Sequence, residues 1–323
     1  MKVISLFSGC GGLDLGFKQA GFKITWANDN DSAVWETFEK NFPETHLDRR
    51  SILDIPSKDI PKCDGIIGGP PCQSWSLAGK MRGINDERGK LFFEYLRILK
   101  DKKPKFFLAE NVSGIISSAH IDSFMQILKM FKEIGYNVNP QPVNASQYGV
   151  PQDRKRVIIV GYHKDIKKEF TFPQPNSRQI PLKEVIRDLP VAKPALEKNR
   201  ANKNLKIANH EYLNGGFSTI YMSRNRRRSW NEPSFTIQAG GRHAPLHPNS
   251  PKMFKIGEDK FGFEKSSKKV RRLSVRECAR IQAFPDEFIF YYGRVSDGYK
   301  MVGNAVPVRL AYILAREIKK DFN

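Results

Sequence analysis

The chain has 323 residues, a length that exceeds one ordinary hydrophobic core and predicts a large domain together with a smaller one. Hydrophobic residues make up 40% and charged residues 27%, and no apolar run is long enough to cross a bilayer, which excludes a membrane-embedded protein and favours a cytoplasmic one without an export signal. The net charge of +20 favours a polyanionic partner, such as nucleic acid or an anionic membrane surface. A basic surface that serves only solubility is the alternative.

The first half of the chain, to about residue 168, alternates short apolar strands with amphipathic helices. Predicted strands cover residues 3–7, 23–27, 64–67, 106–109 and 157–161, and predicted helices cover 13–20, 33–41, 89–99 and 121–134. Repeated strand-helix units are typical of a parallel sheet with helices on both faces. We therefore predict an α/β fold with a doubly wound, mostly parallel sheet.

From about residue 172 the alternation gives way to a region rich in Pro, Asn and Arg. Residues 170–273 contain 21 Lys and Arg against 8 Asp and Glu, so this region carries +13 of the net charge of +20. Regular helices return at residues 274–284 and 306–319. The sequence thus predicts a first domain over 1–171, a smaller irregular domain over 172–273, and a C-terminal segment, 274–323, that packs back on the first domain.

A glycine-rich turn, SGCGG (8–12), connects the first predicted strand to the first predicted helix. Such a turn lets backbone N–H groups at a helix N-terminus approach a ligand, although a purely structural turn fits the same residues. Asp29 follows Gly9 by 20 residues, at the end of the second predicted strand, where a carboxylate can accept hydrogen bonds from ribose hydroxyls. The pair predicts an adenosine-containing ligand, and a nicotinamide cofactor satisfies it equally well.

Four cysteines, Cys10, Cys63, Cys72 and Cys278, stand far apart with no Cys-x-x-Cys pair, so the sequence predicts neither a metal site nor a disulfide framework. Cys72 differs from the other three because it follows a predicted strand in the loop GGPPCQ (68–73). The carboxyl end of a strand in such a sheet borders the ligand crevice, and two prolines hold the loop stiff. We therefore predict a nucleophilic thiol at Cys72 and ordinary buried thiols at the other positions.

Further sequence blocks follow in order along the chain: ENV (110–112), QDRKR (152–156), RECAR (276–280) and GNAVP (303–307). Together with the glycine turn and the PPCQ loop, they make the chain resemble bacterial restriction-modification DNA cytosine C5-methyltransferases over nearly its whole length. The resemblance implies the fold of S-adenosylmethionine-dependent methyltransferases. It also implies that the basic region between the second and third blocks is a target-recognition domain that binds DNA.

The resemblance assigns chemistry to four residues. The Cys72 thiolate adds to C6 of cytosine so that C5 can take a methyl group, and Glu110 acts as the acid beside N3. Arg154 or Arg156 holds the pyrimidine or a neighbouring phosphate, with Arg156 favoured for the base; a structural role is the alternative for either. Because a base inside a duplex cannot present C6 to a thiol, the target cytosine has to rotate out of the helix.

The resemblance also implies S-adenosyl-L-methionine as the cofactor, with S-adenosyl-L-homocysteine as its product. Two positions depart from the family: Ser51 stands where an Asp usually contacts the adenine amine, and Asn30 stands where many relatives carry an aromatic residue. Asp54 or a backbone contact is expected to replace the missing carboxylate. The predicted cofactor-binding residues are Phe7, Gly9, Gly11, Asp29, Asn30, Ser51, Ile52, Pro70 and Asn304.

Arginines concentrate in residues 222–230 and 240–243 of the basic region. Arginine is the best bidentate reader of guanine, but it also binds phosphates, which position a protein without specifying sequence, and both roles stay open. These segments resemble those of enzymes that methylate GGCC-like sites. The predicted DNA contacts are Ser74, Arg82, Arg224, Arg226, Arg227, Arg228 and Arg242.

The predicted protein is a monomeric bacterial DNA (cytosine-5)-methyltransferase, cytoplasmic and associated with the nucleoid when bound to duplex DNA, with no metal and no membrane partner. It is expected to be the protective half of a restriction-modification system, whose endonuclease acts separately. Two alternatives are a tRNA cytosine C5-methyltransferase, which shares the cysteine chemistry, and a non-catalytic DNA-binding protein on the same scaffold. A nicotinamide oxidoreductase explains the glycine turn and Asp29 but neither the Cys72 loop nor the basic region.

Overall fold

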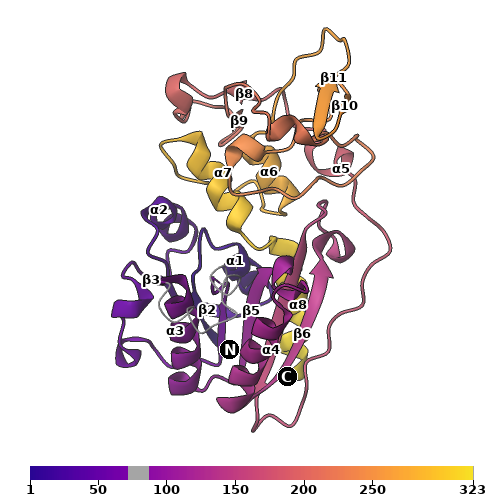
Figure 1. Ribbon diagram of the computed structural model, residues 1–323. Helices are drawn as coiled ribbons and strands as arrows, with labels where there is room; N and C mark the ends of the chain where they lie inside the picture. Colours follow the sequence, from indigo (N-terminus) through magenta and orange to yellow (C-terminus); the bar gives the residue numbers. More distant parts are fainter. Residues whose placement is uncertain (72–86, 323) are drawn as a thin grey trace. The chain divides into compact units, whose positions relative to one another are not determined.

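The computed structural model describes residues 1–71 and 87–322, and it divides into two compact units (Figure 1). Unit 1 comprises Met1–Asn144, Lys155–Pro175 and Leu310–Asn323, and unit 2 comprises Ala145–Arg154 and Asn176–Arg309. In this grouping residues 274–309 join unit 2, whereas the chain from Leu310 onward joins unit 1. The three-part division at residues 171 and 273 remains a prediction. Within the described ranges, no helix is both long enough and apolar enough to cross a membrane.

Unit 1 is built on a seven-stranded sheet in the order β3-β2-β1-β4-β5-β7-β6. The strands from β3 to β5 in this order run parallel, and β7 runs antiparallel to both β5 and β6. The predicted doubly wound, mostly parallel sheet is confirmed. The strands are β1 (Lys2–Leu6), β2 (Lys23–Asn28), β3 (His46–Asp48), β4 (Gly65–Gly68), β5 (Phe106–Val112), β6 (Tyr136–Asn144) and β7 (Lys155–His163).

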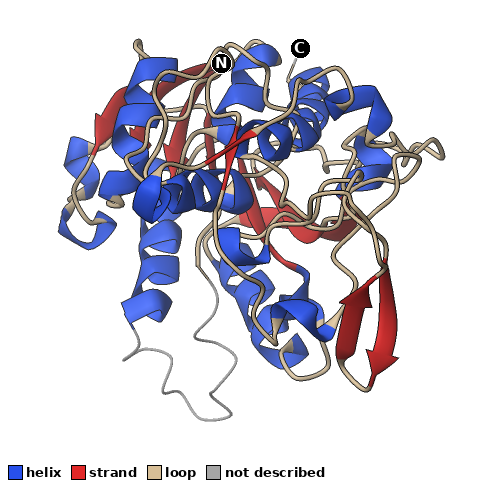
Figure 2. Cartoon of the chain, turned by 90° about the horizontal axis from the view of Figure 1, so that it is seen from above, coloured by secondary structure: helices blue, strands red, loops and turns tan. Residues whose placement is uncertain are grey.

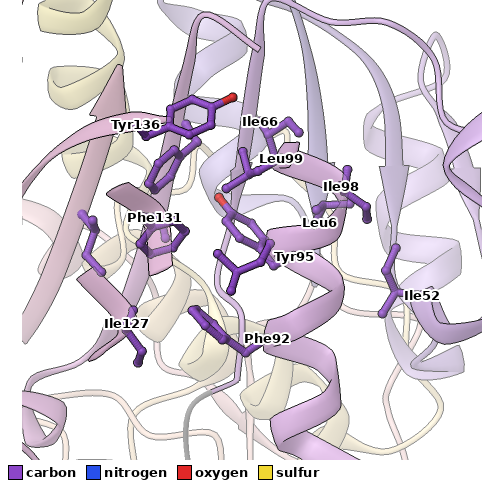
Figure 3. Packing of buried hydrophobic residues seen from close by; sticks show 14 of the residues in the cluster. Leu6, Ile52, Ile66, Phe92, Tyr95, Ile98, Leu99, Ile127, Phe131 and Tyr136 are labelled. Atoms are coloured by element: carbon purple, nitrogen blue, oxygen red, sulfur yellow. The ribbon is translucent and has the colours of Figure 1, made fainter. Parts of the chain in front are cut away.

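Helices cover both faces of this sheet, as two adjacent residues of β5 show. Phe107 belongs to the buried cluster that includes Phe131 of α4, which is labelled in Figure 3. The two rings stack with 4.5 Å between their centroids. Phe106 points to the opposite face, against Phe17 of α1 and Phe322. Neighbouring residues of a strand face opposite sides, so a buried strand is apolar throughout. The helices are α1 (Gly12–Gln19), α2 (Ser32–Asn41), α3 (Glu87–Lys102), α4 (Ile121–Glu133) and α8 (Val308–Asp321).

Strand β6 is not predicted from the sequence pattern, because Pro140 and Pro142 interrupt it. Proline cannot donate to a sheet ladder, and within sheets it is confined to edge strands, strand starts and bulges. β6 is the last strand in the sheet order and pairs only with β7, along nine residue pairs. The edge position therefore explains how a segment with two prolines forms a long strand.

Unit 2 has little regular structure, which confirms the predicted irregular character of the basic region (Figure 2). Helix α6 lies within the predicted helix 274–284 and starts at a capping box, in which Ser274 Oγ accepts from Glu277 N and the Glu277 carboxylate accepts from Ser274 N. The regular elements are α5 (Lys183–Ile186), α6 (Val275–Ile281), α7 (Val295–Asn304), the parallel pair β8 (Lys193–Pro194) and β9 (Glu211–Tyr212), and the hairpin β10 (Met253–Gly257) and β11 (Lys260–Phe263). In the described part of both units, the single 3-10 turns are η1 (Ile52–Asp54), η2 (Ser57–Asp59), η5 (Ser113–Ile116), η6 (Ala145–Tyr148), η7 (Glu197–Asn199), η8 (Tyr221–Ser223) and η9 (Gly241–His243).

Buried arginines hold unit 2 together where the hydrogen-bonded ladders are short. Arg276 is 1% exposed, and its guanidinium donates to the carbonyl oxygens of Ala208, Pro285 and Phe288 at 3.0–3.2 Å. A loop carbonyl that is removed from water needs a donor, and the five N–H groups of one arginine reach several carbonyls at once. Part of the positive charge of unit 2 therefore serves its own fold.

Candidate active site

The glycine turn between β1 and α1 adopts left-handed backbone conformations. Phe7, Gly9 and Gly11 have φ angles of 55°, 56° and 90°. A Cβ on Gly11 would lie 2.2 Å from the ring of Phe42, so only glycine fits there. A Cβ on Gly9 would meet no atom of the described residues within 4 Å, so the backbone of the turn is open to a bound group. The turn fits the close approach of a cofactor at the N-terminus of α1.

Asp29, which follows β2, ties the glycine turn to the neighbouring strand. Its Oδ2 accepts a hydrogen bond from the N–H of Gly9 at 2.8 Å, and its Oδ1 accepts one from the N–H of Asp31 at 2.9 Å. The structure thus brings together the two residues that the sequence pairs for an adenosine ligand. Asn30 is exposed next to them. A carboxylate held at the carboxyl end of the parallel strands suits the binding of ribose hydroxyls.

Ser51, where the family usually has a carboxylate, begins the 3-10 turn η1. Its hydroxyl oxygen accepts a hydrogen bond from the N–H of Leu53 at 3.4 Å, and Ile52 is buried in the core. The carboxylate at the end of β3 belongs to Asp48, and hydrogen bonds from Arg50 lower the pKa of that carboxyl. Ser51 therefore offers a hydroxyl and its backbone at this position. The contact to the adenine amine stays a prediction.

The loop that leads to Cys72 is anchored where it leaves β4. Pro70 is buried, and its carbonyl oxygen accepts a hydrogen bond from Asn111 Nδ2 at 2.9 Å. A Cβ on Gly69 would lie 3.6 Å from Glu110 Oε2, so the start of the loop lies next to the Glu110 carboxylate. Three predicted residues, Cys72, Ser74 and Arg82, lie outside the described residues.

Glu110 and Arg156 form an ion pair on adjacent strands. Glu110 Oε1 lies 2.8 Å from Arg156 Nε, and the two side chains are 12% and 14% exposed. The atoms are close, but their angle leaves Oε1 without a well-formed hydrogen bond from any described residue. The antiparallel register of β5 and β7 puts Val112 opposite Arg156 and lets the guanidinium reach back to Glu110. A nearly buried carboxylate with a fixed arginine partner can hydrogen-bond the edge of a planar ring.

Arg154 belongs to unit 2 and has different partners. It is 1% exposed, and its guanidinium donates to the carbonyl oxygens of Gly303 and Ala305 at 2.9 and 3.1 Å. These two residues flank Asn304, the exposed last residue of α7. The sequence leaves open which arginine of the QDRKR block contacts the base. The structure places Arg156 beside the carboxylate and gives Arg154 internal partners at the end of α7.

The five arginines of unit 2 that are predicted to contact DNA divide into two groups. Arg226 and Arg227 donate to backbone carbonyl oxygens at 2.7–3.3 Å, and Arg228 pairs with two carboxylates at 2.9 and 3.0 Å. Arg224 and Arg242 are exposed, and no carboxylate of the described residues lies within ion-pair distance of either. Within the described residues, Arg224 and Arg242 thus differ from the other three arginines, whose guanidinium groups have backbone or carboxylate partners.

Arg272 is a residue that the sequence does not single out, and it holds the backbone at Arg242. It is 3% exposed and donates to the carbonyl oxygens of Gly215 and Gly216 at 3.2 and 2.9 Å, with a longer bond of 3.4 Å to the carbonyl oxygen of Arg242. Its Cζ also lies 4.4 Å from the ring centroid of Phe217. The partners are 30 to 57 positions away, so no local pattern marks this role.

Unit 1 combines a parallel sheet with an antiparallel β7, an open glycine turn and a carboxylate after β2, and these features define an S-adenosylmethionine-dependent methyltransferase fold. The residues fit that cofactor, because the turn is open at Gly9 and Asp29 is held beside it. Residues 1–320 match the family model of the C-5 cytosine-specific DNA methylases. The chain belongs to this family.

Similar proteins agree with this assignment over their whole length. The Type II methyltransferase M.MthTI of Methanothermobacter thermautotrophicus is 59% identical over 323 residues, which cover 99% of this chain and 98% of that protein. The Type II methyltransferase M.FnuDI of Fusobacterium nucleatum is 56% identical, with 99% and 94% covered. A solved putative DNA modification methyltransferase encoded within an E. coli prophage has the same fold, with a TM-score of 0.75 at 23% identity and coverage of 100% and 99%.

The chain is therefore an enzyme that methylates C5 of cytosine in DNA and uses S-adenosylmethionine. The relatives favour neither a tRNA substrate nor a non-catalytic role, and a nicotinamide oxidoreductase does not fit the family. Among residues 1–71 and 87–322 no group of three or more His, Cys, Asp or Glu side chains could hold a metal ion.

Proposed function

We propose that the chain methylates a cytosine that has rotated out of a specific short duplex site, with Cys72 as the nucleophile, and that it protects DNA in a restriction-modification system. The ion pair of Glu110 and Arg156 is the observation that carries the assignment of residues. Glu110 lies on β5, the strand next to β4, and the anchored Cys72 loop starts at the end of β4. A thiol, an acid and a donor that holds the ring are the groups that this reaction needs.

In the proposed reaction the Cys72 thiolate forms a bond to C6 of cytosine, and the displaced π electrons of the ring reach N3, which takes a proton from Glu110. S-adenosylmethionine would supply the methyl group: C5 takes it with the electron pair of the C4–C5 double bond that the addition creates, and the S–CH3 bond breaks to leave S-adenosylhomocysteine. A base, which water can serve as, then removes the proton from C5. The electrons of that C–H bond restore the C5–C6 double bond, the C6–S bond breaks, and N3 returns its proton to Glu110.

Burial is what makes Glu110 suitable for this role. Charge that develops on N3 is stabilised most by a donor already in place in a site of low polarity, and Glu110 is only 12% exposed. Arg156 restricts the carboxyl group to one orientation and has further N–H donors for the carbonyl oxygen of the pyrimidine. We therefore assign Arg156, and not Arg154, to the base.

We assign the cofactor to the carboxyl ends of β1, β2 and β4. Asp29 is proposed to bind the ribose hydroxyls, and the open turn at Gly9 accepts the part of the cofactor that approaches the backbone. Asn304 is a further proposed contact, with Arg154 holding the backbone on both sides of it. The other proposed contacts are Phe7, Gly11, Asn30, Ser51, Ile52 and Pro70.

Arg224 and Arg242 are proposed to contact a GGCC-like target, because they are exposed and lack internal carboxylates. Arg226, Arg227 and Arg228 are proposed to act mainly on the fold of the same segment, since each has internal partners. Ser74 and Arg82 remain proposed DNA contacts. We further propose that the enzyme is a cytoplasmic monomer and that a separate endonuclease recognises the same site.

Bisulfite sequencing of DNA from cells that express the chain tests this function. Methylated cytosines are expected in one short sequence context, and their absence from every context would contradict the proposal. With purified protein, a duplex that carries 5-fluorocytosine at the methylated position should form a stable adduct with the wild type and none with Cys72→Ser. Methylation of tRNA, but not of duplex DNA, would instead support the tRNA alternative.

A further inference from the structure

Unit 2 contains a pocket of about 830 Å³ that has no part in the function described so far. Its wall is formed by the segment that leads from α5 into β8, by Tyr212 of β9, by Trp230 with two residues beside it, and by three basic residues near the end of the basic region. The lining residues are Ile186, Arg187, 189–194, Tyr212, Trp230, His247, Asn249, Lys268, Lys269 and Arg271. None of the lining residues is among those assigned to catalysis, the cofactor or target recognition. The volume lies in the range of pockets that take small ligands.

The pocket is strongly basic. Five of its lining residues are Lys or Arg, and none is Asp or Glu. The charge of Arg271 is balanced within the fold, because its guanidinium binds both carboxylate oxygens of Glu277 at 2.7 and 2.8 Å. The other four cations are exposed, and no carboxylate of the described residues lies within ion-pair distance of any of them. They are Arg187, Lys193, Lys268 and Lys269.

These cations lie around one short sheet and not at scattered points. β8 and β9 pair in parallel, with Lys193 opposite Glu211 and Pro194 opposite Tyr212. Lys269 Nζ lies 5.8 Å from the centroid of the Tyr212 ring. Lys193, Lys269 and Tyr212 all line the pocket, where the charges of the two lysines add and attract an anion.

A half-buried indole forms the other part of the wall. Trp230 Nε1 donates a hydrogen bond to Asn249 Oδ1 at 2.8 Å, and the ring of His247 meets the indole edge to face, with 5.2 Å between centroids and an interplanar angle of 87°. Burial lowers the pKa of His247 to about 4, so this ring is uncharged at neutral pH. Val191, on the same wall, is 82% exposed. The pocket thus offers a fixed aromatic surface and an exposed apolar side chain beside its cations.

A ligand for this pocket needs a negative charge and a flat, partly apolar group. An acidic peptide supplies charge without a planar ring, whereas a nucleotide supplies a phosphate and a base that stacks on aromatic side chains. We propose that the pocket binds a nucleotide, with the phosphate near Lys193, Lys268 and Lys269 and the base against Trp230. The nucleotide is either free or the unpaired end of a DNA strand. The proposal does not depend on the chemistry of Cys72.

The test uses the full chain and the fluorescently labelled oligonucleotide (dT)4, which contains neither the target cytosine nor guanine. Binding is followed by anisotropy and by quenching of tryptophan fluorescence. Replacing Lys268 and Lys269 together by Ser should weaken (dT)4 binding by about tenfold, because two of the proposed phosphate contacts are lost. The matched control replaces Lys255 and Lys260 on the β10–β11 hairpin by Ser, which removes the same charge from unit 2 outside the pocket. The control should change binding by no more than about twofold.

Trp230→Leu should weaken binding to a similar extent and remove most of the quenching, while its circular dichroism and its affinity for S-adenosylhomocysteine report an intact fold. dTMP and a duplex with a four-nucleotide overhang identify the source: strong binding of dTMP points to a free nucleotide, and binding of the overhang alone points to a strand end. Three results would each overturn the proposal. The first is that (dT)4, dTMP and the overhang duplex all fail to bind, and the second is that the lysine variant and its control lose the same affinity for (dT)4. The third is that an oligo-glutamate peptide binds as strongly as (dT)4. Methylation of a blunt duplex should persist in the variant with Lys268 and Lys269 replaced by Ser, so a failure of the methyltransferase assignment would be seen separately.

Discussion

Unit 1 and unit 2 satisfy their polar groups in different ways. In unit 1 the backbone pairs along seven strands, and charged side chains such as Asp29 and Glu110 are found where strands end. In unit 2 the ladders are short, and buried arginines such as Arg276 and Arg272 donate to loop carbonyls. A charged residue at a strand end of unit 1 is therefore a candidate for chemistry. For a charged residue of unit 2, it must first be determined whether its side chain stabilises the fold or lies on a surface that can bind a ligand.

The largest effect is expected at the nucleophile of unit 1. Cys72→Ser should lower the rate of methyl transfer by at least about a thousandfold, because a hydroxyl is far less ionised than a thiol at neutral pH. Calorimetry with S-adenosylhomocysteine and a DNA-binding titration should both stay within about twofold of the wild type, since those contacts lie elsewhere. Retained turnover would remove Cys72 from the mechanism. A loss of DNA binding would show that chemistry and recognition are not divided between the units.

Asp14 breaks the pattern of unit 1, because its carboxyl group is fully buried on α1. Burial raises the pKa of Asp14 to about 7, and the nearby Ser5 hydroxyl offsets this only in part, without a well-aligned hydrogen bond. An acid whose pKa is raised by folding destabilises the fold once it ionises. The cost is absent below about pH 4, grows up to about pH 7 and is constant above it.

Asp14→Asn removes this ionisation and provides the test. The difference in free energy of unfolding between the variant and the wild type should grow by about 4 kcal/mol, in favour of the variant, from pH 4 to pH 8. Urea unfolding at a series of pH values measures it. A difference that does not change with pH would mean that Asp14 stays neutral, or stays charged, throughout this range.

The scaffold arginines of unit 2 give the next largest effect. Arg276→Met should lower the free energy of unfolding by about 3 kcal/mol, because the buried carbonyl oxygens of Ala208 and Phe288 lose a charged donor. Arg224→Met is the matched control, since it removes the same group from an exposed position, and it should change stability by less than about 0.5 kcal/mol. Equal losses in the free energy of unfolding of the two variants would contradict the distinction between arginines that stabilise the fold and arginines on the surface.

The smallest effects are expected at the exposed arginines. Arg224→Ala and Arg242→Ala should each weaken binding to the methylated sequence by about 1–3 kcal/mol if they read bases. If either contacts only phosphate, binding should fall equally for all sequences and the salt slope should decrease by about one. Titrations of target and non-target duplexes at several salt concentrations distinguish these outcomes. Lys203→Ala, at another exposed position of unit 2, is the control and should leave both quantities unchanged.

Much of unit 1 can be predicted from the sequence because its signals are local. β1, β2, β4, β5 and β7 coincide with predicted strands, and the first four helices coincide with predicted helices. β3 has only three residues, too few for a periodic pattern, and β6 carries two prolines. Asp29 and Gly9 follow β2 and β1, and because these two strands are parallel neighbours, their carboxyl ends bring the two residues together.

The rest of the site depends on contacts between distant residues. Glu110 meets Arg156 only because β7 runs antiparallel to β5 in one register, and the sequence does not give that register. Arg224 is exposed, whereas the Arg226 guanidinium, two positions later, donates to the backbone carbonyl oxygen of Tyr221 in η8. This difference depends on which of the two side chains turns toward η8. Composition predicts that such a region binds a polyanion, but the fold decides which arginines remain for it.

The prolines of β6 have a consequence for the crowded cell in which the chain folds. Pro140 and Pro142 are two positions apart and so face the same way, and the ladder to β7 continues past both of them. The donors that they remove are therefore those of the open edge, where a strand from another molecule would add. An edge strand that lacks these donors resists pairing with strands of other molecules during synthesis, when many copies of the chain are only partly folded.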